Sequence, residues 1–293
     1  MYEIRKSELI LNDDGSIYHL NLKKEDIADT IILVGDKDRV PLISALFDQV
    51  DVKKNKREFH THSGIYKGRK LSVISTGIGT DNIDIVLNEL DALHNIDLES
   101  RQPKSNLTKL NFIRMGTCGS LQNDIDVNSF ILSRYGIGFD NLMHYYKNQN
   151  DEDERIISQH LKEHLLSKAV EQDFYLYSCS KELLSLFGKN FHQGLTATAS
   201  GFYGPQGRCL RAAVRYPDLV EHLSSFRFGN QRILNFEMET SAIYALSRLL
   251  GHRAITVNLV LANRIKGTAS ANYQEKMKEM ASQLLDVILS FPE

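Results

Sequence analysis

Short apolar runs alternate along the chain with longer segments in which apolar residues recur every three to four positions. The runs are rich in β-branched residues and predict buried strands over residues 30–34, 71–75, 111–115, 129–133, 194–199 and 254–261. The longer segments predict helices over residues 38–47, 239–250 and 273–291, and from residue 80 onward. This alternation predicts one α/β domain, residues 1–293, with a largely parallel sheet and a leading arm at residues 1–16.

The helix that begins at Thr80 shows the helical period most clearly. Threonine is a good capping residue, and the apolar positions that follow form one face: Ile83, Val86, Leu87, Leu90 and Leu93. Gly251 ends the helix over residues 239–250, because glycine is favoured directly after a helix.

Two polar segments interrupt the regular pattern without marking a domain boundary. Residues 95–109 are a polar excursion between a predicted helix and a predicted strand. Residues 147–155 carry the acidic run Asp151-Glu152-Asp153-Glu154, which indicates a solvated loop or the start of a helix.

Composition and charge exclude several classes of protein. An apolar content of 42% and a charged content of 25% are typical of a globular enzyme. A net charge of −2 predicts no nucleic-acid partner, and the absence of an apolar run near about 18 residues predicts no membrane partner. The three cysteines form no CxxC pair, and His60 and His62 have no carboxylate at ligand spacing, so we expect no metal site. A cytoplasmic location fits these features.

Three glycine-containing turns follow predicted strands. They occupy residues 34–39, 76–80 and 114–119, and two of them carry an arginine, Arg39 or Arg114. None is a Walker loop, and Asn82 stands where a dinucleotide-binding fingerprint needs its third glycine. Since ligands of open α/β sheets bind at the carboxyl ends of strands, the turns predict an anion site there.

Two further segments carry groups suited to a nucleoside. Residues 201–208 combine two aromatic rings with an amide and a guanidinium, which suits stacking on a flat heterocycle and hydrogen bonding to its edge. Glu237 and Glu239 flank Met238 just before a predicted helix, an arrangement that suits a sugar with hydroxyl groups. The same two carboxylates also fit a glycosidase acid–base pair, and that alternative stays open on residue types alone.

Seven segments, in order along the chain, resemble the nucleoside phosphorylase family whose members are trimers or hexamers, and are most similar to the uridine phosphorylases. They are Tyr18-His19-Leu20, residues 35–40, Arg57-Glu58-Phe59, and residues 75–79, 114–119, 202–208 and 236–239. The resemblance implies a single three-layer α/β domain with a mixed, barrel-like central sheet. It also implies phosphorolysis of a nucleoside to free base and (deoxy)ribose 1-phosphate, with inorganic phosphate as co-substrate and no metal or organic cofactor. A homo-oligomer is expected, with a dimer as the unit and possible assembly to a hexamer.

The resemblance assigns roles to individual residues. The phosphate site would comprise Gly35, Arg39, Arg114 and Thr117, with Arg57 from a neighbouring subunit. The base site would comprise Phe202, Gln206 and Arg208. The ribose site would comprise Met238 and Glu239, with His19 from the neighbour. Arg208, Gln206 and Glu239 are the expected catalytic residues, since the first two stabilise charge on the departing base and the third orients the sugar.

Departures from the family pattern bear on the choice of base. Gly204 and Pro205 are exchanged relative to the family's usual order. Asn263 stands near the position where purine-specific members place an aspartate, and Arg264 after it matches the uridine enzymes. Asn263 and Arg264 favour a pyrimidine, whereas the exchange of Gly204 and Pro205 can redirect Gln206 and counts against that choice. A purine nucleoside and either ribose or 2′-deoxyribose stay open.

Two other functions remain as alternatives. A hydrolytic nucleosidase would not need Arg39, Arg57 and Arg114, and a nucleotide-binding protein would need the missing glycine. Cys118 lies in a glycine-flanked turn with no accompanying His–Asp pattern, which indicates a packing residue rather than a nucleophile.

Overall fold

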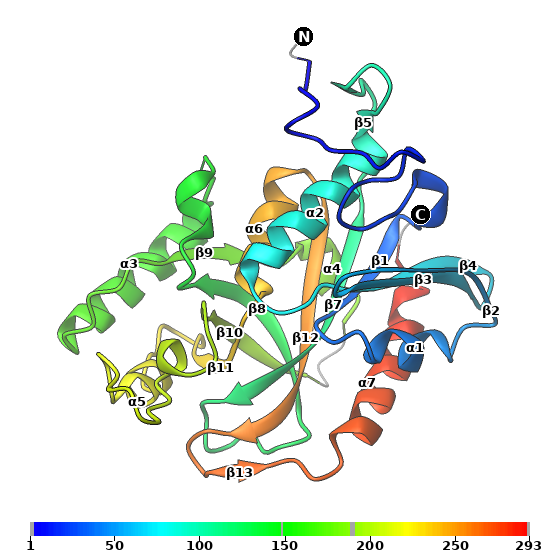
Figure 1. Ribbon diagram of the computed structural model, residues 1–293. Helices are drawn as coiled ribbons and strands as arrows, with labels where there is room; N and C mark the ends of the chain where they lie inside the picture. Colours follow the sequence, from blue (N-terminus) through cyan, green and yellow to red (C-terminus); the bar gives the residue numbers. More distant parts are fainter. Residues whose placement is uncertain (1–2, 148, 188–190, 292–293) are drawn as a thin grey trace.

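A closed five-stranded barrel forms the centre of the molecule. The computed structural model describes residues 3–147, 149–187 and 191–291. Around the ring the strands are β7 (Asn111–Ser120), β12 (Arg253–Asn263), β8 (Phe130–Gly138), β10 (His192–Thr198) and β11 (Ile233–Glu237), and β11 pairs with β7 to close it (Figure 1). Their apolar residues are almost entirely buried, because helices cover the barrel outside and side chains fill it inside.

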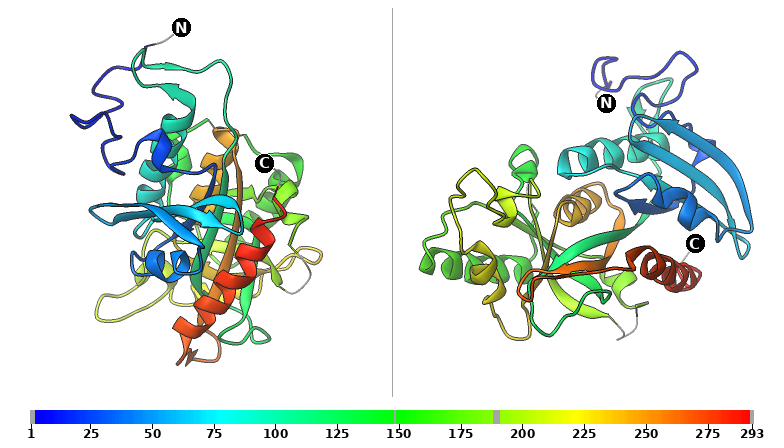
Figure 2. Two further views of the ribbon diagram at one scale, coloured as in Figure 1. Left: turned by 90° about the vertical axis from the view of Figure 1, so that its right-hand side faces the viewer. Right: turned by 60° about the horizontal axis from the view of Figure 1, so that its bottom comes forward.

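Four strands extend the sheet from β7 as a curved wing. In order they are β1 (Thr30–Val34), β4 (Arg69–Ser75), β3 (Phe59–Tyr66) and β2 (Gln49–Lys56), and Figure 2 shows the wing projecting beyond the barrel. Two short strands, β9 (Tyr175–Ser178) and β13 (Thr268–Ala269), pair with β8 and β12. A separate two-stranded sheet consists of β5 (Ile96–Asp97) and β6 (Gln102–Pro103).

The strand directions are mixed, so the expectation of a largely parallel sheet is wrong. β7 runs parallel to β1 and β12 but antiparallel to β11, and β8 runs antiparallel to β12. The ring of five strands therefore contains two antiparallel pairs and three parallel pairs. Register shifts at Gly194/Leu195 and Val260/Ala262 increase the local twist that closure needs.

Helices pack on both sides of the sheet, which gives the three layers. α2 (Thr80–Asn95) lies against α6 (Thr240–Leu249) on one side, and α1 (Arg39–Ser44) lies against α7 (Tyr273–Ile288) on the other (Figure 2). α3 (Glu152–Ser167) contacts β9, α4 (Lys181–Leu184) contacts β12, and α5 (Leu219–Ser224) contacts β11. Three short 3-10 turns are η1 (Lys24–Asp26), η2 (Leu142–Tyr145) and η3 (Gly204–Gln206).

Most predicted elements are present, with shifted ends. The strand over residues 30–34 and the helix starting at Thr80 are confirmed, and the apolar face of that helix is buried. Helix α1 is shorter than predicted, and α7 ends at Ile288 rather than Phe291. Strands β2 and β9 had not been predicted, because β2 is polar on one face and β9 is short.

The predicted turn at residues 114–119 is instead the second half of β7. Residues 116–119 continue the pairing with β12. An ideal Cβ on Gly116 would lie 2.1 Å from Asn258 Oδ1, so glycine is required there by close approach within the barrel rather than by a turn. Thr117 and Cys118 consequently stand on a strand.

The acidic run starts helix α3. Asp151 is its N-cap and accepts a hydrogen bond from the Glu154 backbone N–H at 2.9 Å. Glu154 is fully buried, where its Oε1 lies 2.7 Å from Arg248 Nη2. This part of the run is therefore an internal ion pair and not a solvated surface.

Candidate active site

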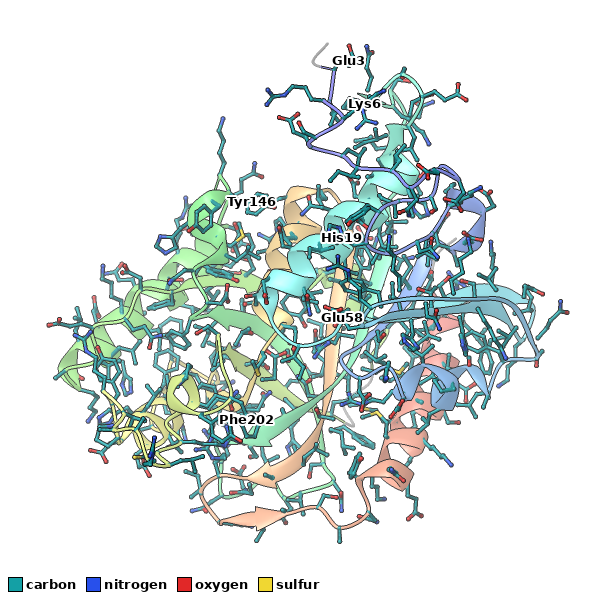
Figure 3. The ribbon with its side chains drawn as sticks, in the orientation of Figure 1. Glu3, Lys6, His19, Glu58, Tyr146 and Phe202 are labelled. Atoms are coloured by element: carbon teal, nitrogen blue, oxygen red, sulfur yellow. The ribbon has the colours of Figure 1, made fainter. Side chains whose placement is uncertain are left out.

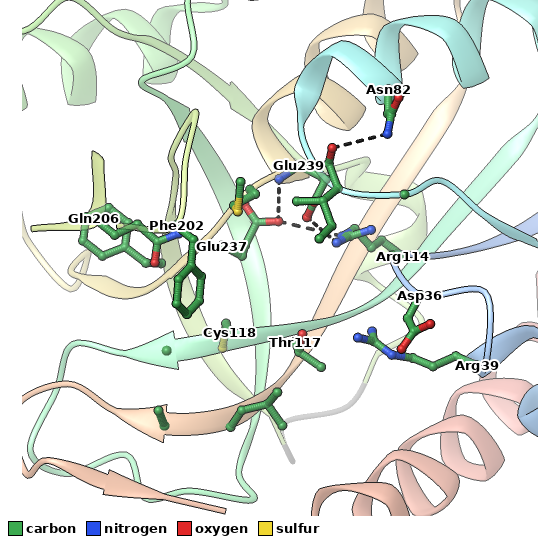
Figure 4. A pocket seen from close by; sticks show the side chains of 18 of the residues that line it. Asp36, Arg39, Asn82, Arg114, Thr117, Cys118, Phe202, Gln206, Glu237 and Glu239 are labelled. Atoms are coloured by element: carbon green, nitrogen blue, oxygen red, sulfur yellow. Dashed lines mark hydrogen bonds and ion pairs between the residues drawn. The ribbon is translucent and has the colours of Figure 1, made fainter. Parts of the chain in front are cut away.

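One cavity of about 780 Å³ opens where several strands of the barrel and wing end (Figure 4). β1 and β4 run parallel and deliver the loops at Gly35 and Gly77 to it, while β7 and β11 contribute Arg114 and Glu237. Nine residues predicted for the site line it: Gly35, Arg39, Arg114, Thr117, Phe202, Gln206, Arg208, Met238 and Glu239.

A buried arginine, Arg114, and a partly buried one, Arg39, form one end of the cavity. Arg114 is 3% exposed in its side chain, and its Nη1 and Nε have no hydrogen-bond partner within the described part of the chain. The same is true of Arg39 Nη1. Burial, followed by the charge of Arg114, lowers the pKa of Arg39. Two desolvated like charges with unpaired N–H donors form a site suited to a small anion.

Two carboxylates lie next to this end. Glu239 accepts a hydrogen bond from the Gly79 N–H at 2.9 Å and another from Arg114 Nη2. Glu237 accepts from Thr198 Oγ1 at 2.6 Å and from the backbone N–H groups of Glu239 and Thr240 at 2.9 Å. Burial and then the charge of Glu239 raise the pKa of Glu237 to about 7, while Arg114 opposes the shift. The two carboxylates therefore share one guanidinium.

The opposite end of the cavity is flat and polar. The guanidinium carbon of Arg208 lies 3.8 Å from the centroid of the Phe202 ring, and Arg208 Nη1 donates to Gln206 Oε1 at 2.6 Å. Gln206 is buried in η3, while the Phe202 ring is 52% exposed. Burial, followed by the nearby charge of Arg264, lowers the pKa of Arg208 to about 10. A stacking ring beside an amide and a guanidinium matches a planar heterocycle with polar edge groups.

Two predicted residues lie outside this cavity. Arg57 has a left-handed backbone (φ +55°) in the turn between β2 and β3, and its neighbour Glu58 lines the cavity instead. His19 lies against α2, where its Nδ1 is 2.6 Å from Glu89 Oε1 (Figure 3). Their assignment to a neighbouring subunit stays a prediction.

Several lining residues were not predicted. They are Asp36, Lys37, Glu58, Gly77, Ile78, Asn82, Cys118, Gly119, Phe236, Leu261 and Ala262, whereas Glu237 had been considered with Glu239 for the sugar. Most belong to the segments that carry the family resemblance, so the sequence did mark these positions as candidates for the site. Burial raises the pKa of the Cys118 thiol well above its ordinary value, which keeps it uncharged and unsuited to nucleophilic attack.

Comparisons with known proteins show the family to which the chain belongs. The family model described as the phosphorylase superfamily matches residues 29–292, so the chain belongs to that superfamily. It is 29% identical to a uridine phosphorylase of Thermococcus kodakarensis over 287 residues, covering 96% of this chain and 90% of that one. It is 27% identical to a DeoD-type purine nucleoside phosphorylase of Bacillus thuringiensis, covering 92% and 98% of the two chains.

Solved structures give the same family and the fold. A nucleoside phosphorylase of Trypanosoma brucei, reported to show uridine phosphorylase activity, superposes with a TM-score of 0.85 at 32% identity, covering 97% of this chain and all of the other. A uridine phosphorylase of Phytophthora capsici, at 23% identity, superposes with a TM-score of 0.71 over the whole of both chains, a likeness that concerns the fold alone. The family resemblance and the fold class predicted from sequence are both confirmed.

Proposed function

We propose that the protein catalyses phosphorolysis of uridine or a related pyrimidine nucleoside, giving free base and (deoxy)ribose 1-phosphate. The observation that carries this proposal is the set of buried, unpaired N–H groups on Arg39 and Arg114. They lie at the end of the cavity away from the Gln206–Arg208 pair (Figure 4). Phosphate at one end and a base at the other leave the sugar between them, beside Glu239.

Phosphate is the anion that best fits the arginine end. A guanidinium donates two parallel hydrogen bonds to a phosphate, and the hydroxyl of Thr117 and the backbone of Gly35 line the same cavity. A nucleosidase that uses water would gain nothing from two desolvated arginines.

The reaction needs no protein nucleophile. The bond between C1′ and the base breaks, its electron pair leaves with the base, and positive charge develops on the sugar. A phosphate oxygen then forms the new bond to C1′ from the opposite face, which gives the α-sugar 1-phosphate with inversion. Arg208 and Gln206 stabilise the charge on the departing base, each typically worth a few kcal/mol when preorganised. This chemistry requires neither a metal nor an organic cofactor.

Glu239 and Met238 are proposed to hold the sugar. Both line the cavity, and Glu239 is itself fixed by Gly79 and Arg114. A carboxylate held in this way has lone pairs left to accept hydrogen bonds from sugar hydroxyls.

The position of Asn263 supports a pyrimidine over a purine. Its Nδ2 donates to the carbonyl oxygens of Gln122 and Ile125, and its Oδ1 accepts from the N–H groups of Ile265 and Lys266. The side-chain hydrogen bonds of Asn263 therefore join the loop after β7 to the loop after β12. An amide used in this way supplies no proton to the N7 of a departing purine.

The charges lining the cavity support a shared site in a homo-oligomer. Four cationic residues (Lys37, Arg39, Arg114 and Arg208) face four acidic ones (Asp36, Glu58, Glu237 and Glu239), so their formal charges cancel before phosphate is bound. Arg57 from a second subunit would restore a positive balance, and His19 would reach the sugar by the same route. We propose a dimer as the working unit within a protein located in the cytoplasm; no described helix has the length and apolar character to cross a membrane.

The proposal is tested by incubating the protein with uridine, inosine and adenosine, each with and without inorganic phosphate, and following free base. We expect uracil to be released fastest and only when phosphate is present. Release of base at an equal rate in phosphate-free buffer would support hydrolysis instead, and faster release from inosine or adenosine would support a purine enzyme.

A further inference from the structure

Glu89 holds His19 against helix α2 through four contacts. Its Oε1 lies 2.6 Å from His19 Nδ1, both carboxylate oxygens accept from the His19 backbone N–H at 3.1 Å, and Oε2 accepts from the Leu20 N–H at 3.0 Å. Glu89 is 9% exposed and stands in the middle of α2. A buried carboxylate with this many donors fixes both the backbone and the ring of its partner.

This contact decides which nitrogen of the His19 ring is available. In a neutral imidazole one nitrogen donates and the other accepts. Because a carboxylate only accepts, the neutral tautomer that fits this contact has its proton on Nδ1, facing Glu89, and its lone pair on Nε2. The His19 side chain is 30% exposed, and Nε2 has no hydrogen-bond partner within residues 3–147, 149–187 and 191–291. An acceptor is thus presented at the surface in a fixed direction.

The segment around His19 is tied to the strand end that carries Arg57. The Tyr18 ring packs edge-on against the His19 ring, with centroids 4.8 Å apart. Lys56 Nζ lies 4.3 Å from the centroid of the Tyr18 ring and donates to the Tyr18 carbonyl at 2.5 Å and to Asn12 Oδ1 at 2.9 Å. Lys56 directly precedes Arg57, so the two residues expected to reach a neighbouring subunit belong to one rigid unit.

We propose that Glu89 is a positioning residue for sugar recognition, which holds His19 so that its Nε2 accepts a hydrogen bond from the free 5′-hydroxyl of a nucleoside bound in the neighbouring subunit. This inference rests on the proposed function. It commits the enzyme to nucleosides with a 5′-hydroxyl. A 5′-deoxynucleoside has no 5′-hydroxyl proton to donate to His19 Nε2. A negatively charged 5′-phosphate would face the Nε2 lone pair, with the Glu89 carboxylate on the other side of the ring, and would bind poorly.

The test compares uridine with 5′-deoxyuridine as substrates. For wild type, Glu89→Ala and Glu89→Gln, the ratio of kcat/KM for uridine to kcat/KM for 5′-deoxyuridine is measured. We expect Glu89→Ala to lower this ratio about tenfold, the value of one hydrogen bond, mainly through KM for uridine. Glu89→Gln retains one acceptor oxygen but places an amide N–H₂ near backbone donors. Its substrate ratio should therefore fall between the ratios of wild type and Glu89→Ala.

Asp91→Ala is the matched control. Asp91 lies on the same helix and also pairs with a histidine, since its Oδ1 is 3.1 Å from His252 Nε2, but it forms no hydrogen bond or ion pair with residues 3–20. Removing it perturbs α2 without affecting His19, and the substrate ratio should stay at the wild-type value. If Glu89→Ala lowers kcat/KM equally for both substrates, or if Asp91→Ala changes the ratio as much, Glu89 is only structural and the proposal is overturned.

A second measurement needs no substrate. Long-range ¹⁵N spectra of histidine-labelled protein, assigned with His19→Gln, report which ring nitrogen carries the proton. We expect protonated Nδ1 and unprotonated Nε2 in wild type, and the reverse in Glu89→Ala. Unprotonated Nδ1 in wild type overturns the role of Glu89 alone, whereas failure of wild type to release base from any nucleoside contradicts the proposed function itself.

Discussion

Glu237 is a buried carboxyl whose protonation state changes the charge next to the phosphate site. Its pKa is raised to about 7 by burial and by Glu239, and its Oε2 lies 3.8 Å from Arg114 Nε. Above pH 7 it adds a negative charge beside the anion site. We therefore predict that KM for phosphate rises between pH 6 and pH 8 in wild type relative to Glu237→Gln, because phosphate ionises identically in both assays.

Glu237→Gln is a suitable reference because Thr198 Oγ1 can reverse its hydrogen bond and accept from the new amide. Stability gives an independent readout. A carboxyl whose folded pKa is raised stabilises the fold below its unfolded pKa, near 4.5, and this stabilisation is lost as the pH rises through about 7. The free energy of unfolding of wild type should thus fall relative to Glu237→Gln over that window. Parallel pH profiles for the two proteins would show that Glu237 does not titrate there.

Arg208 is predicted to stabilise the departing base. Arg208→Ala should lower kcat/KM for uridine by about 10²–10³, the usual cost of one preorganised donor, with most of the loss in kcat. Arg208→Lys keeps the charge but loses the fork that reaches Gln206 and the stack on Phe202, so it should recover only part of the rate. The neighbouring Cys209→Ala is the control, since Cys209 is exposed and absent from the cavity lining. Near-normal turnover by Arg208→Ala would remove Arg208 from the base site.

The types of residue at the site could be predicted from sequence, but their electrostatic state could not. Arg39, Arg114 and Glu239 lie in short motifs, and each does line the cavity. The raised pKa of Glu237 depends on the strand and helix that bury it, and nothing in its sequence neighbourhood indicates that burial. Glu58 was passed over beside Arg57, because a sequence does not indicate which of two adjacent side chains turns inward.

At the scale of elements, the polar excursion after α2 serves to hold the N-terminal arm. Arg101 is 8% exposed and donates to the carbonyl oxygens of Ile4 at 2.7 Å, Arg5 at 3.2 Å, and Leu9. The Arg101 carbonyl accepts from the Ile4 N–H in return. The arm therefore docks on a small two-stranded sheet that no periodic pattern had revealed.

We predict that Arg101→Ala loosens residues 3–12 without affecting the barrel. Hydrogen–deuterium exchange should accelerate in peptides of the arm and of residues 96–104, with a fall in Tm of a few °C, since a few kcal/mol at most is lost in a chain of this size. Arg101→Lys should be intermediate, because an ammonium cannot reach all three carbonyls at once. Unchanged exchange in the arm would mean that the backbone contacts alone hold it.

Two errors in the strands predicted from sequence have different physical causes. β2 is an edge strand with three lysines, Lys53, Lys54 and Lys56, and its pattern resembles a polar loop although lysine is typical of protected sheet edges. The strand predicted over residues 111–115 is shorter than β7, because Gly116 and Gly119 resemble a turn in the sequence. In the structure these glycines allow the side chains of Asn258 and Arg264 to approach closely. The β7 error comes from contacts with β12, which is far away in the chain, whereas β2 pairs with the neighbouring strand β3 and was missed because of its polar composition.

At the scale of the whole molecule, we predict that each active site is shared between two subunits. Arg57→Ala and Glu239→Ala should each lose at least about 100-fold in kcat/KM, through the phosphate and the sugar respectively. In a hybrid dimer carrying one change per subunit, one site lacks both residues and the other lacks neither. We therefore predict about half of wild-type activity for purified hybrids made with two affinity tags. Inactive hybrids of proven composition would show that Arg57 belongs to no neighbouring site.

Phosphorolysis itself is tested most directly by following the phosphorus atom. Wild-type protein, uridine and inorganic phosphate are incubated and observed by ³¹P NMR while uracil is measured in the same sample. The site predicts that inorganic phosphate is converted to a pentose 1-phosphate of α configuration, one molecule for each uracil released. Uracil release with an unchanged phosphate signal and accumulation of free pentose would contradict the account, because the arginine end of the cavity would then not supply the attacking group.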